Sequence, residues 1–208
     1  DSFGHAMPNT WHTMSVMLSA ANCIDWVTKL TQFSNVETAL LAAENRVDHA
    51  GNVIFLPYLS GERTPHNDAN AKGVFWGMTH DTSPADLVQA VLEGVSFALL
   101  DGLDAVRSAQ DINNSIDVIG GGAKSTYWLQ LLADVFAVPM DYREGGEVGP
   151  ALGAARLAAI GNKGQDTVND ICVKPQLIKR YQPNSEKSAY YAKKRERFHD
   201  LYQRLKGL

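Results

Sequence analysis

Residues 116–142 read IDVIGGGAKSTYWLQLLADVFAVPMDY, and this stretch decides the fold class. Its first four residues are a mostly β-branched run that predicts a strand, and this strand leads directly into three glycines. Apolar residues then recur at helical spacing from about Ser125, and residues 139–142 predict a second strand. A strand, a helix and a second strand in this order predict an α/β layer with parallel strands.

The middle of the chain predicts a strand, a loop and a long helix. Residues 53–59 form a short apolar run between turn residues, which is typical of a buried strand. Residues 60–72 form a polar loop, long enough to suggest a functional reason for its length. Ser83 and Pro84 are typical of a helix start, and one apolar face continues from there to about Ser108.

The rest of the chain predicts shorter elements. The small residues of the helix expected at 150–160 would let it pack closely against a strand. The other expected elements are a loop through Asn9, a strand near 11–14, helices at 15–30, 38–46 and 185–205, and a surface excursion at 164–175.

Composition narrows the class of protein. The chain has 208 residues, 45% of them apolar and 20% charged, which is typical of one globular domain. A net charge of -4 makes nucleic acid an unsuitable partner. Cys23 and Cys172 belong to no zinc or disulfide pattern, which favours a reducing, cytoplasmic setting, and no apolar run is long enough for a membrane span. Because the first residue is Asp1 and not Met, we expect a longer natural protein.

Two segments are candidates for chemistry. The turn from Gly120 to Ala123 would let a ligand approach the backbone at a helix start, although a tight turn without a ligand explains it equally well. The 60–72 loop could transfer protons or contact phosphate, but an ordinary surface loop is the favoured interpretation; its candidate residues are Glu62, Arg63, His66 and Asp68. The chain contains no GxxxxGK[ST] motif, which excludes phosphate binding by a P-loop.

Residues 73–93 resemble the carboxy-terminal signature of the FGGY family of carbohydrate kinases. Segments 11–20, 55–66 and 148–155 look like those of the family members that phosphorylate D-xylulose. The signature begins with a small residue, an aromatic or aliphatic residue, Gly and an aliphatic residue, and after a spacer it continues with acidic, apolar, small, apolar and acidic positions. These positions are filled here by Gly73, Phe75, Gly77, Met78, Asp86, Leu87, Ala90, Leu92 and Glu93.

This resemblance implies a fold and a domain organisation. FGGY kinases are similar to actin and hexokinase, with two ribonuclease H-like α/β domains, each a mixed sheet flanked by helices, that close on a cleft. Residues 1–208 would be the carboxy-terminal nucleotide-binding domain. The general-base Asp and the phosphate loop would lie upstream of Asp1, so we expect no catalytic residue or metal ligand here and no activity of the isolated chain.

The resemblance also implies ATP and Mg²⁺ as cofactors. It places the adenosine against the glycine turn, with Ser125 or Thr126 near the purine or ribose and the first helix on the other side. Related kinases commonly have Asn at the position of Thr126, and Gly and Gln at those of Ala21 and Asp25. The full set of implied cofactor-binding residues is Ala21, Asp25, Gly121, Gly122, Ala123, Ser125 and Thr126.

The leading hypothesis is that the full-length protein converts D-xylulose to D-xylulose 5-phosphate with ATP. Its partners would be the sugar, ATP and its own amino-terminal domain, with a homodimer left open. One alternative is another FGGY kinase, acting on ribulose, gluconate or glycerol. Two others are a non-catalytic, actin-like nucleotide-binding domain and a purely structural α/β module.

Overall fold

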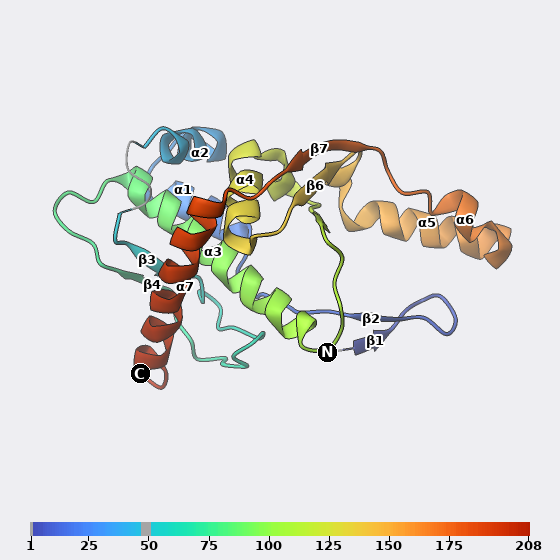
Figure 1. Cartoon of the computed structure of the whole chain (residues 1–208), viewed down its shortest axis with the longest axis horizontal. Coiled ribbons are helices and arrows are strands. Elements are labelled where there is room, and N and C mark those ends of the chain that lie inside the picture. The colour runs from blue at the N-terminus through green and yellow to red at the C-terminus, as the bar shows by residue number, and fades with distance from the viewer. Residues whose placement is uncertain (1, 47–50) are drawn as a thin grey trace.

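The computed structural model describes residues 2–46 and 51–208, and helix α3 (Pro84–Arg107) lies at the centre of its main body (Figure 1). The predicted start of α3 is confirmed. Ser83 accepts a hydrogen bond from the backbone N–H of Asp86, and the Asp86 carboxylate accepts one from the N–H of Ser83. This reciprocal cap and Pro84 at the first helical position define where the helix begins.

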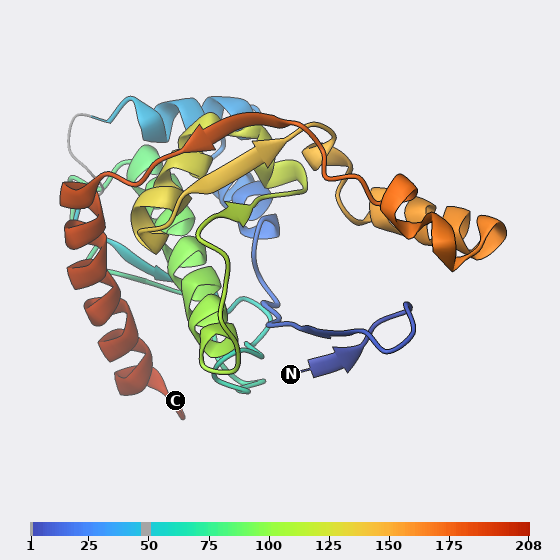
Figure 2. The ribbon, with the colours of Figure 1, turned by 45° about the vertical axis from the view of Figure 1, so that its right-hand side comes forward.

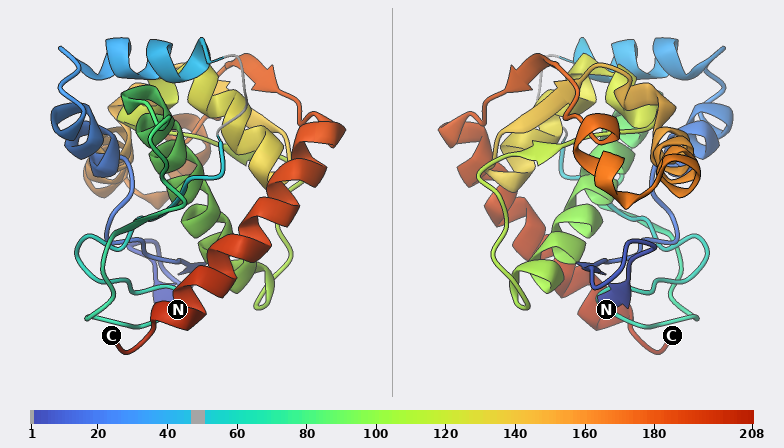
Figure 3. Two further views of the ribbon diagram at one scale, coloured as in Figure 1. Left: turned by 90° about the vertical axis from the view of Figure 1, so that its left-hand side faces the viewer. Right: turned by 90° about the vertical axis from the view of Figure 1, so that its right-hand side faces the viewer.

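The elements around α3 bury most of its surface. Figure 3 shows helices from both ends of the chain lying against it. The predicted buried strand forms a short antiparallel hairpin with the segment after the 60–72 loop, and Phe55 packs against Phe75 across it. The elements of the body are α1 (Asn22–Leu30), α2 (Val36–Glu44), β3 (Ile54–Leu56), β4 (Val74–Trp76), α4 (Thr126–Phe136) and α7 (Ser185–Leu205).

A three-stranded mixed sheet borders α4. Strand β5 (Ile116–Asp117) pairs in parallel with β6 (Met140–Arg143), and β6 pairs antiparallel with β7 (Leu177–Tyr181). The predicted parallel pair and the mixed sheet are therefore confirmed. Strand β7 was not predicted, because four of its five residues are exposed and it includes Lys179 and Arg180, so it lacks the apolar alternation of a half-buried strand.

Two segments project from the body on the same side (Figures 1 and 2). One is a hairpin of β1 (Ser2–Gly4) and β2 (Trp11–Thr13). The other follows β6 and contains η2 (Gly146–Val148), α5 (Pro150–Lys163), η3 (Gln165–Thr167) and α6 (Val168–Ile171).

Helix α5 corrects one expectation about packing. Only Ile160 is buried in α5, and this helix packs mainly on η3 and α6. The expected packing of α5 against a strand is therefore wrong for the described residues. Pro at the first position and the alanine-rich sequence are enough to form the helix, but they do not provide a partner for its face.

The expected start of the first helix is also wrong. The helix predicted from Ser15 begins only at Asn22, because the backbone at Val16 pairs with the 60–72 loop: the Val16 N–H donates to Thr64 Oγ1 and the Val16 carbonyl accepts from the Thr64 N–H. In a helix from Ser15, the Val16 carbonyl would instead accept from the N–H of Ala20, four residues later.

Three smaller corrections concern other segments. Residues 2–4, expected as a loop, form β1, whereas Asp1 lies outside the described residues. The helix expected at 38–46 runs from Val36 to Glu44. The excursion at 164–175 is mostly exposed as expected, but it contains η3 and α6. None of the described helices combines the length and the apolar character that crossing a membrane requires.

Candidate functional site

A cleft of about 710 Å³ separates the glycine turn from helices α1 and α2. One wall is η1 (Gly121–Lys124) with the start of α4, and the other wall is formed by α1 and α2. Six of the seven predicted cofactor-binding residues line this one cleft, although the two groups lie about a hundred positions apart in the chain; they are Ala21, Asp25, Gly121, Gly122, Ser125 and Thr126.

Ala123 is the exception. It follows Gly122 in η1, but its side chain points into the protein, is only 2% exposed and does not line the cleft. The structure therefore separates Ala123 from the other six predicted residues. The spacing of residues in a turn does not show which side chain faces inward, because that depends on how the turn packs on α4.

The three glycines of the turn occupy their positions for different structural reasons. A Cβ atom on Gly122 would lie 2.8 Å from the Trp128 ring, so packing against α4 requires a glycine there. Gly120 has a φ of +92°, a left-handed conformation that favours glycine. A Cβ atom on Gly121 would meet nothing within 4 Å. Gly121 is therefore the position where the backbone is open to a ligand in the cleft.

The start of α4 is fixed by Ser125 and Trp128. The Ser125 hydroxyl accepts a hydrogen bond of 3.1 Å from the backbone N–H of Trp128, which caps the helix. The Trp128 ring nitrogen donates to the hydroxyl of Ser96 in α3, also at 3.1 Å. The turn wall of the cleft is thus anchored to the central helix, and the Ser125 hydroxyl is already engaged in capping.

The opposite wall includes residues that sequence reasoning missed. Helix α2 contributes apolar and acidic side chains to the cleft, and its amphipathic pattern indicates a helix without indicating what its faces contact. Carboxylates on this wall could accept hydrogen bonds from amino groups of a ligand, while Lys124 lies on the turn side. The missed residues of this wall are Ile24, Val36, Glu37, Leu40, Leu41 and Glu44.

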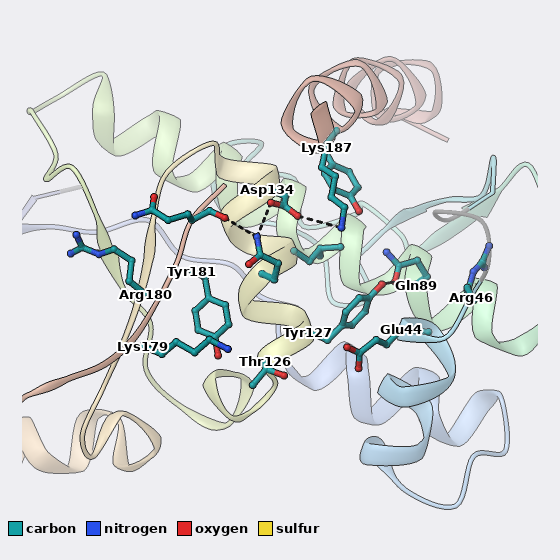
Figure 4. Close-up of a pocket in the computed structure, with 15 residues that line it drawn as sticks. Glu44, Arg46, Gln89, Thr126, Tyr127, Asp134, Lys179, Arg180, Tyr181 and Lys187 are labelled. Atoms are coloured by element: carbon teal, nitrogen blue, oxygen red, sulfur yellow. Dashed lines mark hydrogen bonds and ion pairs between the residues drawn. The ribbon is translucent and has the colours of Figure 1, made fainter. Parts of the chain in front are cut away.

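A second cavity of about 570 Å³ adjoins the cleft, because Glu44 and Thr126 line both (Figure 4). Some of the polar groups that line it are paired with one another. The Tyr127 hydroxyl donates to Gln89 at 2.6 Å, and burial raises the pKa of Tyr127 to about 12, which keeps this hydroxyl protonated at neutral pH. Asp134 accepts from the side chain of Gln130 at 2.9 Å.

A second glycine-rich turn reaches the same region from another part of the chain. The N–H of Gly120 donates to the carbonyl of Gly146 at 2.8 Å. Gly149 also approaches Gly120, since a Cβ atom on Gly149 would lie 3.8 Å from the Gly120 Cα atom. The two glycine-rich turns therefore pack against each other, which neither turn indicates by itself.

The 60–72 loop does not contribute to the cleft. None of its four candidate residues lines the cleft, and Glu62 is buried inside the body. His66 stacks on Tyr202 of α7, and burial lowers the pKa of His66. Asp68 accepts hydrogen bonds from the N–H of Asn70 and the hydroxyl of Tyr202, and these bonds hold the pKa of Asp68 below its usual value.

Over residues 2–46 and 51–208, the structure contains no group of three or more His, Cys, Asp or Glu side chains that could hold a metal ion. Both cysteines are free thiols, with Cys23 buried and Cys172 exposed. The acidic residues of the cleft do not converge on one point, so this part of the chain does not fit a resident metal site.

Comparisons with known proteins relate the chain to sugar kinases. The model of the FGGY family of carbohydrate kinases, C-terminal domain, matches residues 2–161. The chain is 51% identical to a xylulose kinase of Escherichia coli (strain K12), over 98% of this chain and 42% of that protein. The crystal structure of a xyloylose kinase from Brucella ovis is similar with a TM-score of 0.88 and 42% identity, over 98% of this chain and 42% of that one.

A gluconate kinase from Lactobacillus acidophilus is also similar, with a TM-score of 0.73 and 29% identity, over 91% of this chain and 39% of that one. These structural matches confirm the expected fold class, the actin- and hexokinase-like ATPase fold with a mixed sheet. The chain spans about two fifths of the length of these relatives.

Proposed function

We propose that this chain, which belongs to the FGGY family of carbohydrate kinases, is the nucleotide-binding domain of a two-domain enzyme that phosphorylates D-xylulose with ATP. The observation that carries the proposal is the convergence of six predicted residues on one cleft. The substrate assignment is supported by the high identity to a xylulose kinase along almost the whole chain.

In this proposal the cleft holds the adenosine end of ATP. The open position at Gly121 lets the backbone approach the ligand closely, and Thr126 lies near the base or ribose. Ala21 and Asp25 approach from α1 on the other side. A cleft with apolar walls and a few polar groups suits a purine, since apolar contacts provide affinity and polar groups fix orientation.

The domain would provide binding and positioning. Phosphoryl transfer depends on aligning the sugar hydroxyl with the γ-phosphate, and the cleft residues assigned here would contact only the adenosine end of ATP. The general base and the phosphate loop would belong to the preceding part of the enzyme. We assign no Mg²⁺ ligand to this chain, because the described residues form no suitable cluster; Mg²⁺ bound to the phosphates would neutralise their charge.

The first test is a sugar panel with the full-length enzyme. ATP consumption would be measured with D-xylulose, ribulose, gluconate and glycerol. The highest kcat/KM is expected for D-xylulose. Preference for another sugar would reject only the substrate, whereas phosphorylation of none would favour an actin-like binding domain.

The second test places a side chain in the cleft. Gly121→Leu should raise the KM for ATP by about tenfold or more, because its side chain would occupy the cleft without meeting the protein at its Cβ atom. Gly153→Leu in α5 is the matched control, since a Cβ atom there also meets nothing within 4 Å and lies away from the cleft. Equal effects of the two substitutions on the KM would contradict the proposed site.

Self-association of the isolated chain remains a separate prediction. Among the described strands, β5 pairs only with β6, so its other edge offers unpaired backbone groups to a second copy. Light scattering should detect dimers or larger species of the isolated chain, and a strictly monomeric chain would contradict this prediction.

A further inference from the structure

Glu62 is a buried carboxylate that the proposed chemistry does not use. Its side chain belongs to the 60–72 loop but is only 2% exposed. Backbone hydrogen bonds of 2.8 Å in both directions between Glu62 and Asp68 close the loop over it. Burial raises the pKa of Glu62. Burying a polar group lowers stability unless the group is hydrogen-bonded. The role of the Glu62 carboxylate therefore depends on which groups it accepts hydrogen bonds from.

The Glu62 carboxylate holds a distant segment of backbone. Its Oε1 atom accepts hydrogen bonds from the N–H of Leu18 at 3.2 Å and from the N–H of Arg63 at 2.7 Å. Beside it, the Val16 backbone makes two hydrogen bonds of 3.1 Å with Thr64. Three hydrogen bonds therefore tie residues 16–18 to residues 62–64.

Residues 16–18 lead directly to one wall of the cleft. Only two residues separate Leu18 from Ala21, which lines the cleft at the start of α1, and Asp25 follows in the first turn. The start of α1 has no side-chain cap, whereas α2, α3, α4 and α7 each have one. An uncapped helix start is not fixed by its own sequence, so its position depends on what holds the preceding residues.

We infer that Glu62 is a positioning residue for the cleft: its carboxylate holds the backbone of Leu18 and thereby sets where Ala21 and Asp25 stand opposite the glycine turn. This inference rests on the proposed function in one respect, namely that the cleft takes a nucleotide. Glu62 does not line the cleft, so it acts on Ala21 and Asp25 through the backbone of residues 16–21.

The test compares two substitutions in the full-length enzyme. Glu62→Gln keeps an oxygen that can accept from Leu18 and Arg63, whereas Glu62→Ala removes it. With Glu62→Ala, we expect faster amide hydrogen exchange across residues 16–25 and a KM for ATP about tenfold higher, because Ala21 and Asp25 would no longer be held opposite the glycine turn. The KM for the sugar should stay unchanged, and Glu62→Gln should lie within about twofold of the wild type for both.

Asp134→Ala is the matched control for lost stability. Asp134 is also a buried carboxylate that accepts from a distant backbone N–H, that of Asn184 at 2.8 Å, but it does not line the cleft. This variant should lower the melting temperature without raising exchange selectively at residues 16–25 or changing the KM for ATP.

Thr64→Val is a milder version of the test, because it removes only the bond from the Val16 N–H to the Thr64 hydroxyl. It should produce smaller changes in the same direction, and it keeps the inference testable if Glu62→Ala does not fold. The inference would be overturned if amide exchange at residues 16–25 were unchanged in both variants. If Glu62→Ala does not fold, unchanged exchange in Thr64→Val alone would overturn it. If exchange depends on Glu62 but the wild type binds no ATP, the proposed function fails while the positioning of α1 stands.

Discussion

Helices α3 and α5 begin in the same way and end up in opposite environments. Each has a proline at its first helical position and contains glycine among small or apolar residues. Yet 14 of the 24 residues of α3 are buried, whereas α5 buries only Ile160 (Figure 1). Local sequence therefore decides whether a helix forms, while the surrounding elements decide how much of it is buried.

The glycines of the two helices show the same difference in packing. A Cβ atom on Gly94 in α3 would lie 2.2 Å from the carbonyl oxygen of Phe55, so β3 packs directly on the backbone of the helix. A Cβ atom on Gly153 in α5 would meet nothing within 4 Å. The same residue type is a packing requirement in the first helix and a conformational cost in the second.

The largest expected effect comes from breaking the ion pair between Glu93 of α3 and Lys194 of α7. Lys194 of α7 lies 2.5 Å from the Glu93 carboxylate, and both side chains are almost fully buried. Lys194→Met should lower the free energy of unfolding by about 3–5 kcal/mol, because it leaves a buried carboxylate without this cation. Urea unfolding measures the change. The double variant Glu93→Gln with Lys194→Met should recover part of the loss, and a loss as large as in the single variant would contradict this explanation.

A smaller effect is expected in the sheet from which α5 extends. Arg180 of β7 donates two hydrogen bonds, of 2.6 and 2.8 Å, to the buried carboxylate of Asp141 in β6. These bonds hold the pKa of Asp141 below its usual value near 3.8. Asp141→Asn should therefore lower the free energy of unfolding at neutral pH by about 1.5–3 kcal/mol.

The pH dependence gives the sign of this interaction. A carboxyl group with a lowered pKa stabilises the fold above its unfolded pKa, and this stability is lost as the pH falls through its folded pKa. The wild type should lose stability as the pH falls below about 4, whereas Asp141→Asn should lose less over the same range. Urea unfolding at a series of pH values measures both, and parallel curves would show that Asp141 is not responsible.

The direct test of the comparison uses the two glycines. Gly94→Ala should destabilise the protein by about 1–3 kcal/mol, because the added methyl group would collide with the β3 backbone. Thermal unfolding measures the effect. An unchanged melting temperature would mean that α3 and β3 can separate without cost.

The smallest effect is expected in α5 and has the opposite sign. Gly153→Ala should stabilise its helix by up to about 1 kcal/mol, because alanine has the higher helix propensity and its methyl group meets no neighbour. Hydrogen exchange of the α5 amides measures this gain. Slower exchange is expected, and faster exchange would indicate a partner for this face that α5 lacks among the described residues.

Much of the fold could be predicted because its signals are local. The cap of α3 depends on Ser83 and Asp86, which are three positions apart, and the parallel pair of β5 and β6 follows from the order of neighbouring elements. The start of α1 and strand β7 were missed for the opposite reason. Residues 16–18 are held by residues 62–64, and β7 exists through its pairing with β6.

The residues of the candidate site also divide into those with a local sequence signal and those without one. The glycine turn and the family resemblance indicated both sides of the cleft, including Asp25 and Gly121, and the structure brings these residues together. The wall formed by α2, the inward direction of Ala123 and the burial of Glu62 carried no local signal. Each depends on packing between segments that are distant in the chain.

Local sequence signals therefore predicted most of the helices, the glycine turn, the family and the residues on the two walls of the proposed site. The burial of α3, the exposure of α5 and the position of Glu62 next to the backbone of Leu18 carried no such signal. Capping, helix propensity and turn conformation act over a few neighbouring residues, whereas burial and long-range hydrogen bonds exist only once distant segments have packed together.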